Sequence, residues 1–182
     1  MKKQIHTPID EKIAKSLRAG DAIYITGTIY TARDAAHKRM YECMIEEKEI
    51  PFSLKNTIIY YLGPTPAREG QIIGSAGPTT SSRMDKYTPL LLENGLKGMI
   101  GKGKRSKEVI DAMKQNNAVY FAAIGGVGAL LSKCIKQSEI IAYDDLGTEA
   151  IRKLYVEEFP VIVVIDCEGN NLYETEPKKY SE

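Results

Sequence analysis

Tryptophan is absent from this chain, and cysteine and histidine are rare. The 182 residues include no Trp, three Cys and two His. The cysteines Cys43, Cys134 and Cys167 are odd in number and widely spaced, and none belongs to a Cys-x-x-Cys pair. This usage argues against a disulfide framework and against a self-contained metal site. It predicts reduced, mostly buried thiols.

The chain also lacks an excess of charge of either sign and lacks a long apolar run. The chain carries 25 basic and 24 acidic residues, so its net charge is +1. General nucleic-acid binding needs a large basic surplus, and we therefore expect no nucleic-acid partner. The longest apolar runs, such as Val161 to Ile165, fall far short of the roughly 20 residues that span a bilayer. The polar N-terminus lacks a signal-peptide core, so we expect a cytoplasmic protein with no membrane contact.

The length predicts a single domain over residues 1–182, large enough to bury a core without disulfides or metal. Predicted strands and helices alternate, with several strand, glycine-loop and helix passages, which favours an α/β fold. Strands are expected at 22–29, 57–62, 70–75, 97–100, 119–124, 139–143, 161–165 and 172–174. Helices are expected at 10–19, 34–48, 84–94 and 106–115, and from the glycines at 125–128 to 133.

The segment from Gly74 to Asp85 concentrates groups that bind small anions. It reads Gly-Ser-Ala-Gly-Pro-Thr-Thr-Ser-Ser-Arg-Met-Asp and precedes an expected helix. A flexible backbone, four consecutive hydroxyl residues, Arg83 and a helix N-terminus would all serve an anion. The alternative is a plain helix start, with Ser81 or Ser82 as N-cap and Asp85 completing a capping box. That alternative accounts for one hydroxyl of the four and not for Arg83.

A second polar loop surrounds Arg33, which opens an expected helix. The helix dipole does not favour a cation there. Either a bound anion or an ion pair with Asp34 or Glu46 would explain the placement. His37 lies one turn further on. A lone helical histidine more often packs than catalyses, so the sequence assigns it no role.

Two glycine-containing loops follow later strands. Lys102 lies between two glycines in Gly-Lys-Gly-Lys-Arg-Ser. This segment is either a ligand loop, where bare backbone admits close approach, or a solvated basic turn, and it lacks the phosphate-loop spacing. Gly-Gly-Val-Gly at 125–128 is a weak dinucleotide signal, and close packing of a helix on the sheet is the better interpretation.

Arg33, Arg83 and Lys102 together predict a site for two carboxylates or phosphates, because arginine forks match carboxylates bidentately. Thr79 and Thr80 are candidates to orient or deprotonate a substrate, for which nearby cations would have to lower the threonine pKa. The sequence offers no paired acid and base and no metal ligands. The predicted chemistry is therefore incomplete within this chain.

Four motifs then occur in order: Gly-Thr-Ile-Tyr-Thr-Ala-Arg-Asp-Ala-Ala-His-Lys-Arg-Met, Tyr-Tyr-Leu-Gly-Pro-Thr-Pro, the Gly74 to Asp85 segment, and Gly-Lys-Gly-Lys-Arg-Ser. Together they resemble the β subunit of class I fumarases and L-tartrate dehydratases, which are iron–sulfur hydro-lyases. The similarity extends from Thr7 to about Tyr173 and so covers almost the entire chain.

The resemblance implies a swivelling β/β/α domain that closes over a [4Fe-4S] cluster. It implies that three cysteines of a separate, larger α subunit bind the cluster, so that this chain holds no metal. The expected partners are that α subunit, in a heterodimer or an α2β2 assembly, and a small dicarboxylate substrate. The implied reaction is the reversible trans hydration of fumarate to malate, with one iron acting as Lewis acid.

Transferred position by position, the resemblance implies that Arg33, Arg83 and Lys102 bind the substrate carboxylates. It assigns catalysis to the Gly-Pro-Thr-Thr motif, with Thr79 as the better candidate for the base and Thr80 beside it. Arg-Met-Asp favours the fumarase branch over the tartrate branch. The alternatives are a tartrate dehydratase β subunit, a stand-alone phosphate- or nucleotide-binding module, and a purely structural subunit.

Overall fold

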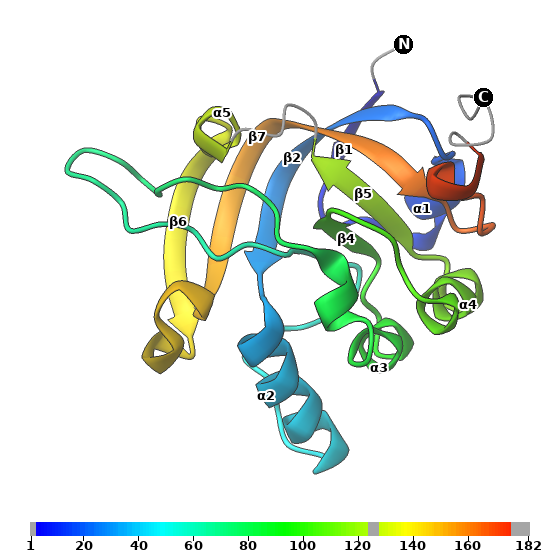
Figure 1. Ribbon diagram of the computed structural model, residues 1–182, viewed down its shortest axis with the longest axis horizontal. Helices are drawn as coiled ribbons and strands as arrows, with labels where there is room; N and C mark the ends of the chain where they lie inside the picture. Colours follow the sequence, from blue (N-terminus) through cyan, green and yellow to red (C-terminus); the bar gives the residue numbers. More distant parts are fainter. Residues whose placement is uncertain (1–2, 124–127, 176–182) are drawn as a thin grey trace.

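One sheet of seven strands, in the order β1-β2-β3-β4-β5-β7-β6, organises the molecule. A computed structural model of the chain describes residues 3–123 and 128–175. Strand β2 also pairs with β7, so β2, β3, β4, β5 and β7 close into a five-stranded barrel (Figure 1). The predicted mixture of helices and strands is confirmed, whereas the closure of the sheet was not predicted.

The strands are β1 (Lys3–His6), β2 (Ala22–Thr31), β3 (Ile58–Tyr60), β4 (Gly98–Gly101), β5 (Val119–Ala123), β6 (Ile135–Ala142) and β7 (Ile151–Ile165). The α-helices are α1 (Glu11–Ser16), α2 (Asp34–Ile45), α3 (Thr88–Glu93), α4 (Lys107–Asn116) and α5 (Gly128–Ser132). Two 3-10 helices, η1 (Ser81–Met84) and η2 (Asp144–Glu149), complete the elements. No helix in the described ranges is long and apolar enough to cross a membrane.

Strand direction determines where the loops meet. Each neighbouring pair from β1 to β5 is parallel. Strand β7 runs antiparallel to β2, β5 and β6. The carboxyl ends of β2, β3, β4 and β5 therefore lie at one edge of the barrel. Ligands of open α/β sheets bind outside such carboxyl ends, so this edge is the first place to look for a site.

Alternate strand residues face two different cores, as the two-residue period of a strand requires. Ile58 and Tyr60 of β3 belong to a cluster inside the barrel, whereas Ile59 and Tyr61 belong to a cluster on its outside. Helices α2, α3 and α4 cover that outer face (Figure 1). We call these clusters the barrel core and the outer core. The barrel core includes Ile23, Ile25, Ile29, Phe121, Leu154, Val156, Phe159, Val161 and Val163, and the outer core includes Met40, Met84, Leu91, Met99, Val109, Met113 and Tyr120.

Side-chain caps account for where two helices begin. The Asp10 carboxylate accepts a hydrogen bond from the Ile13 amide at the start of α1. The Ser106 hydroxyl accepts one from the Val109 amide at the start of α4. Both positions follow the usual preference for Asp and Ser as N-caps. The Ser106 cap also fixes the exit of the loop that contains Lys102.

Several predicted elements are wrong. Residues 70–75 form no strand, because Ser75 bonds across the segment to the Thr65 hydroxyl at 2.7 Å instead of to a neighbouring strand. The expected helix at 84–94 is divided into η1 and α3. Residues 172–174 are helical, and the Asn171 side chain accepts the Tyr173 amide at their start. Strand β1 was missed, and β7 begins ten residues before the predicted strand at 161–165.

Candidate functional site

The loops after β2, β3 and β4 are joined to one another by backbone hydrogen bonds at the carboxyl edge of the barrel. The Ala32 amide donates to the Tyr60 carbonyl at 3.1 Å, and the Thr79 amide donates to the Tyr61 carbonyl at 2.8 Å. The Ser81 amide donates to the Lys102 carbonyl at 2.8 Å. Five residues predicted from the sequence therefore lie on three connected loops: Arg33, Thr79, Thr80, Arg83 and Lys102.

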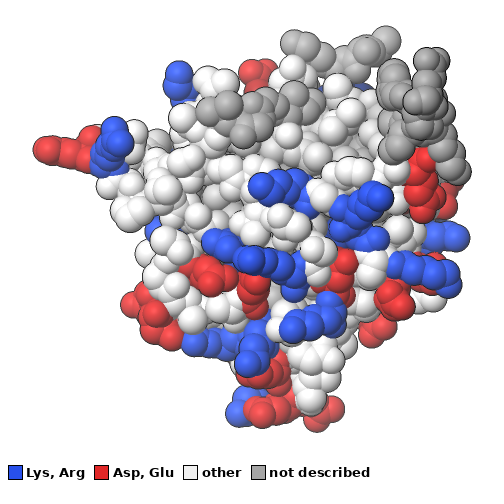
Figure 2. All heavy atoms as spheres, in the orientation of Figure 1, with Lys and Arg blue, Asp and Glu red and all other residues white. Residues whose placement is uncertain are grey.

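These side chains differ in how much of their surface is exposed to solvent. Thr80 and Lys102, which form an isolated β-bridge, are exposed, and the Arg83 side chain is 58% exposed. Arg33 and Thr79 are half-buried. Lysine and arginine side chains gather over the middle of the face shown in Figure 2, with acidic groups between them. The edge therefore presents accessible cations on the same loops as Thr79, whose backbone is fixed by its bond to Tyr61.

Arg33 occupies the N-cap position of α2 without capping it. Its side chain makes no cap hydrogen bond, and the Glu149 carboxylate accepts the Ala35 amide instead at 3.2 Å. The Nε atom of Arg33 is buried and has no hydrogen-bond partner. A Cβ built on Gly63 would lie 2.7 Å from Arg33 Nη1, so this glycine leaves room for the guanidinium.

The ion pair expected for Arg33 is not formed in the described part of the chain. Asp34 pairs with Arg83 at 3.8 Å, and Glu46 pairs with Lys48 at 2.7 Å. The first of these pairs connects η1 to the start of α2. Of the two explanations that the sequence left open for Arg33, the bound anion is the one that its unpartnered buried nitrogen supports.

His37 packs beneath the site rather than within it. The side chain is fully buried, and its Nδ1 donates to the Arg33 carbonyl at 2.8 Å. Its ring meets the Tyr61 ring edge-on, with centroids 5.4 Å apart. Burial lowers the pKa of His37 to about 4, so the imidazole is neutral near pH 7. This histidine fixes the backbone of Arg33 and presents no group to solvent.

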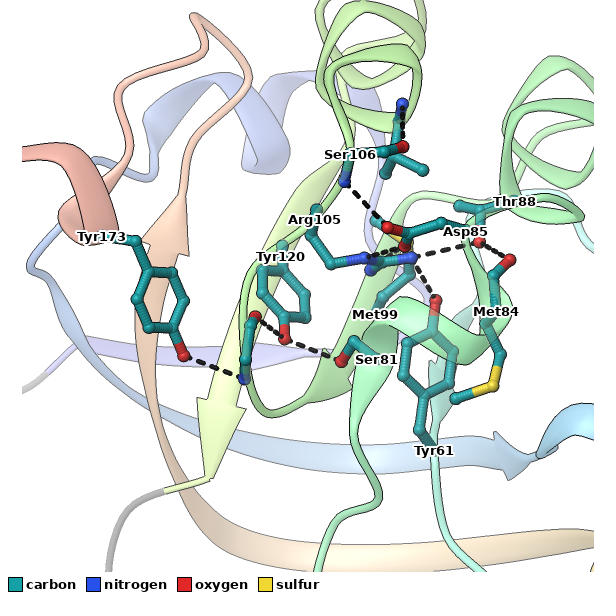
Figure 3. Close-up of polar contacts among 12 residues, drawn as sticks. Tyr61, Ser81, Met84, Asp85, Thr88, Met99, Arg105, Ser106, Tyr120 and Tyr173 are labelled. Carbon is teal, nitrogen blue, oxygen red and sulfur yellow. Dashed lines mark hydrogen bonds and ion pairs between the residues drawn. The ribbon is translucent and has the colours of Figure 1, made fainter.

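A buried arginine, Arg105, which the sequence interpretation missed, contacts both the segment that contains Arg83 and the loop that contains Lys102 (Figure 3). Arg105 Nε donates to Asp85 Oδ1 at 2.7 Å, and its Nη2 donates to the Tyr61 and Thr88 hydroxyls, each at 3.1 Å. The guanidinium also stacks over the Tyr120 ring at 4.8 Å. Burial opposes the charge, but Tyr61, Asp85 and Tyr120 together raise the pKa of Arg105 above its ordinary value.

Neighbouring hydroxyls extend this network. Ser81 Oγ and Tyr120 OH lie 2.7 Å apart, and Tyr120 donates to the Gly103 carbonyl at 2.8 Å. The Gly103 amide in turn donates to the Tyr173 hydroxyl at 2.9 Å. Because Tyr120 donates its single hydroxyl proton to the Gly103 carbonyl, Ser81 is the donor in the hydrogen bond between Ser81 and Tyr120. The loop around Lys102 is thus held from both sides.

The capping-box alternative for the Gly74 to Asp85 segment is wrong. Thr80 is the residue at the N-cap of η1, and its side chain makes no cap hydrogen bond. The Ser81 hydroxyl faces Tyr120, and Asp85 accepts from Arg105 and from the Ser106 amide. Asp85 is therefore a bridge between two loops.

The cysteines of the described ranges lie apart from one another in the sequence and form no disulfide. Cys43 and Cys134 are half-buried, Cys167 is buried, and all three are free thiols. No group of three or more His, Cys, Asp and Glu residues that could hold a metal ion occurs in those ranges. The described residues therefore do not fit the ligand set of an iron–sulfur cluster. Most of the glycine motif at 125–128 lies outside the described residues.

Comparison with known proteins gives a family for this arrangement. The model of the family described as "Fumarase C-terminus" matches residues 2–176, and the chain belongs to this family. It is 40% identical over 178 residues to "Fumarate hydratase 2" of Leishmania major, covering 95% of this chain and 31% of that protein. It is 38% identical over 178 residues to "Fumarate hydratase class I, anaerobic" of Escherichia coli (strain K12), covering 96% and 32%.

A third relative differs in its coverage. The chain is 37% identical over 180 residues to "Putative L(+)-tartrate dehydratase subunit beta" of Methanocaldococcus jannaschii, covering 96% of this chain and 92% of that one. The chain thus spans about a third of the length of the two fumarate hydratases and nearly all of the named β subunit.

Proposed function

We propose that this chain is the β part of an iron–sulfur hydro-lyase that reversibly hydrates fumarate to malate. One observation carries the proposal: Arg33, Arg83 and Lys102 lie on the same set of three connected loops as Thr79, at the carboxyl edge of the barrel. The names of the relatives, all hydro-lyases, support the reaction class. A dicarboxylate needs cations at both ends, and these three side chains supply them.

The chemistry assigned to this chain is binding and proton transfer. The two arginines and Lys102 bind the substrate carboxylates and neutralise the charge that grows on one of them as a C–H bond breaks. In dehydration, Thr79 acts as its alkoxide, after its hydroxyl proton has passed to solvent, and accepts the proton that leaves the carbon beside that carboxylate. The substrate hydroxyl leaves the neighbouring carbon as hydroxide. In hydration, Thr79 returns the proton to the same carbon. The cations on these loops make the Thr79 hydroxyl a stronger acid than an isolated threonine.

The remaining parts of the reaction belong to a partner in this proposal. A larger α subunit holds the [4Fe-4S] cluster, and the two chains assemble as a heterodimer or as α2β2. Exposure of Arg83, Lys102 and Thr80 supports a site that is completed from outside. A swivelling movement of the β part would bring this edge over the cluster.

Anaerobic reconstitution tests the proposal. The chain is mixed with the α subunit, whose gene we expect nearby, and the cluster is assembled before fumarate hydration is assayed. The complex should hydrate fumarate, and the chain alone should be inactive and colourless. A complex with an intact cluster that hydrates neither fumarate nor any related diacid would show that the hydro-lyase assignment is wrong. Nucleotide binding by the isolated chain, measured by calorimetry, would favour a binding module instead.

Two charge deletions test the site within the reconstituted complex. Arg83→Ala and Lys102→Ala should each lower kcat/KM by about 10²–10³-fold, as expected for loss of one preorganised group facing developing charge. Since both side chains are exposed, the melting temperature should hardly change. Lys104→Ala is the matched control, because this exposed lysine lies in the same loop. An equal loss of kcat/KM in the control would mean that the overall charge of the loop, and not these two side chains, causes the effect.

Tartrate dehydration is the second candidate. A relative that this chain covers almost completely is named as a putative tartrate dehydratase β subunit. The same complex should therefore be assayed with L-malate and with L(+)-tartrate under identical conditions. We expect a higher kcat/KM for malate, and the reverse order would assign the tartrate reaction.

A further inference from the structure

Arg105 is placed where it can hold the two loops of the proposed site in register. The side chain is fully buried, yet it lies in the same six-residue motif as Lys102, and Asp85, its ion-pair partner, lies two residues after Arg83. We propose that Arg105 is a positioning residue: it sets the geometry of Thr79, Arg83 and Lys102 without touching substrate. The inference rests on the proposed function of those three residues.

The contacts of Arg105 reach the loops after β3 and β4. Asp85 joins the η1 segment to the Gly-Lys-Gly-Lys-Arg-Ser loop, because its Oδ1 accepts Arg105 Nε at 2.7 Å and its Oδ2 accepts the Ser106 amide at 2.8 Å. Tyr61 joins the loop after β3, because its hydroxyl accepts Arg105 Nη2 while its own carbonyl accepts the Thr79 amide. Figure 3 shows these groups converging on one guanidinium.

The second side of the guanidinium is anchored as well. Nη2 also donates to Thr88, whose hydroxyl donates to the Met84 carbonyl at 2.8 Å, so Arg105 reaches the last residue of η1. Tyr120, under the guanidinium at 4.8 Å, donates to the Gly103 carbonyl next to Lys102. A Cβ built on Gly101 would lie 2.0 Å from Ser81 Oγ and 2.7 Å from Tyr61 Cδ2, so the loops touch with no slack.

Stability alone does not explain a charge in this place. Buried ion pairs often contribute no more to stability than well-packed apolar residues of the same volume, because desolvation offsets their attraction. A planar guanidinium with several donors does what an apolar side chain cannot: it fixes directions among separate loops. A lysine at this position would keep the charge but lose the planar set of several donors. We therefore expect the arrangement of the loops, and with it kcat, to depend on the guanidinium group.

Four variants in the reconstituted complex test this role. Arg105→Lys should lower kcat by about 10²-fold with a small change in KM, as expected for a displacement near 1 Å. Tyr61→Phe removes the hydrogen bond to Arg105, and Thr88→Val removes the bonds to Arg105 and to the Met84 carbonyl. Neither change opens a cavity, and each should lower kcat by a smaller factor. They carry the test if Arg105→Lys does not fold. Asp166→Asn is the matched control, because Asp166 is a buried carboxylate that holds the turn at 166–170, at the opposite end of the barrel.

A double-mutant cycle separates positioning from general stability. Because Arg105 acts through Arg83 and Lys102, Arg105→Lys should cost much less in kcat/KM when Arg83→Ala or Lys102→Ala is already present. A merely structural role would give additive losses. Wild-type kcat in Arg105→Lys, Tyr61→Phe and Thr88→Val, or additive losses in the cycle, would overturn the inference and leave the proposed function intact.

Amide hydrogen exchange supplies a readout that does not need activity. In the isolated chain, Arg105→Lys should speed exchange at Thr79, Ser81 and Gly103, whose amides are bonded within this network. Asp166→Asn should speed exchange at 168–170 and leave those three amides unchanged. If exchange responds as expected while the wild-type complex is inactive, the positioning role of Arg105 is supported and the proposed function is wrong. Unchanged exchange at these amides in Arg105→Lys would show that Arg105 does not position the loops.

Discussion

The two cores of this molecule are built from different chemistry. The barrel core is lined by aliphatic and aromatic side chains, and its polar atom, the Tyr60 hydroxyl, is satisfied by the Ala76 carbonyl. The outer core packs against Arg105 and His37, both through Tyr61. The barrel core closes the sheet, and its contribution to stability follows from the burial of apolar side chains alone. The outer core also connects the loops that contain the site, so its polar groups are arranged by direction as well as by volume.

The largest effect on stability is expected in the barrel core. Phe159→Ala removes a fully buried ring that packs against Tyr60, with centroids 5.3 Å apart. The free energy of unfolding should fall by about 3–5 kcal/mol, from lost transfer energy and the cavity left behind. Urea denaturation measures this loss. Below the transition, kcat per folded molecule in the complex should stay at the wild-type value, and a loss of turnover in the folded variant would contradict the separation of the cores.

A pH-dependent effect is expected in the outer core. Burial depresses the pKa of His37 from 6.5 to about 4, so the unfolded chain binds a proton that the folded chain refuses. The stability of the wild type is therefore complete above pH 6.5 and declines as the pH falls toward 4. Between pH 7.5 and pH 5 the free energy of unfolding should drop by about 2 kcal/mol from this group.

His37→Gln tests the assignment by removing the titrating ring. Urea titrations at each pH should show that the decline is absent in His37→Gln and unchanged in His6→Gln, which alters the other, exposed histidine. An equal decline in all three proteins would place the titrating group elsewhere.

The smallest effect is expected at Ser81. Ser81→Ala removes one buried hydrogen bond to Tyr120, and Tyr120 keeps its bond to the Gly103 carbonyl. The free energy of unfolding should fall by about 1 kcal/mol. Thermal melting at constant pH measures this loss. A loss as large as that of Phe159→Ala would mean that the outer core is no less critical to the barrel than the barrel core itself.

The position of the loops that contain the proposed site could be predicted, because their signals are local. Thr79, Arg83 and Lys102 lie in short glycine-containing motifs beside strands, and parallel strands bring such loops to one edge. Arg105 was not predictable in this way, since its burial depends on Tyr61, Asp85 and Thr88 arriving from other segments. No pattern within Gly-Lys-Gly-Lys-Arg-Ser distinguishes the inward side chain from its exposed neighbours.

The barrel was hidden for a related reason. The first part of β7 breaks the strict alternation of a strand twice, with the charged pairs Arg152–Lys153 and Glu157–Glu158, and Pro160 interrupts the apolar pattern. For these reasons only 161–165 was predicted as a strand. Pro160 nevertheless lies in register with Tyr24 of β2. Closure depends on this antiparallel pairing between segments far apart in the sequence, which neither segment reveals by itself.

The pairing of β2 with β7 also has a consequence for how the molecule forms. Strand β2 is early in the chain and β7 is late, so a long intervening loop must be closed before their contacts can form. Such distant pairing is slow, and until it occurs the strand edges stay open to intermolecular contact. During synthesis, the segments that contain Thr79, Arg83 and Lys102 emerge from the ribosome before the strand that completes their support. Assembly with a partner would therefore have to wait for β7.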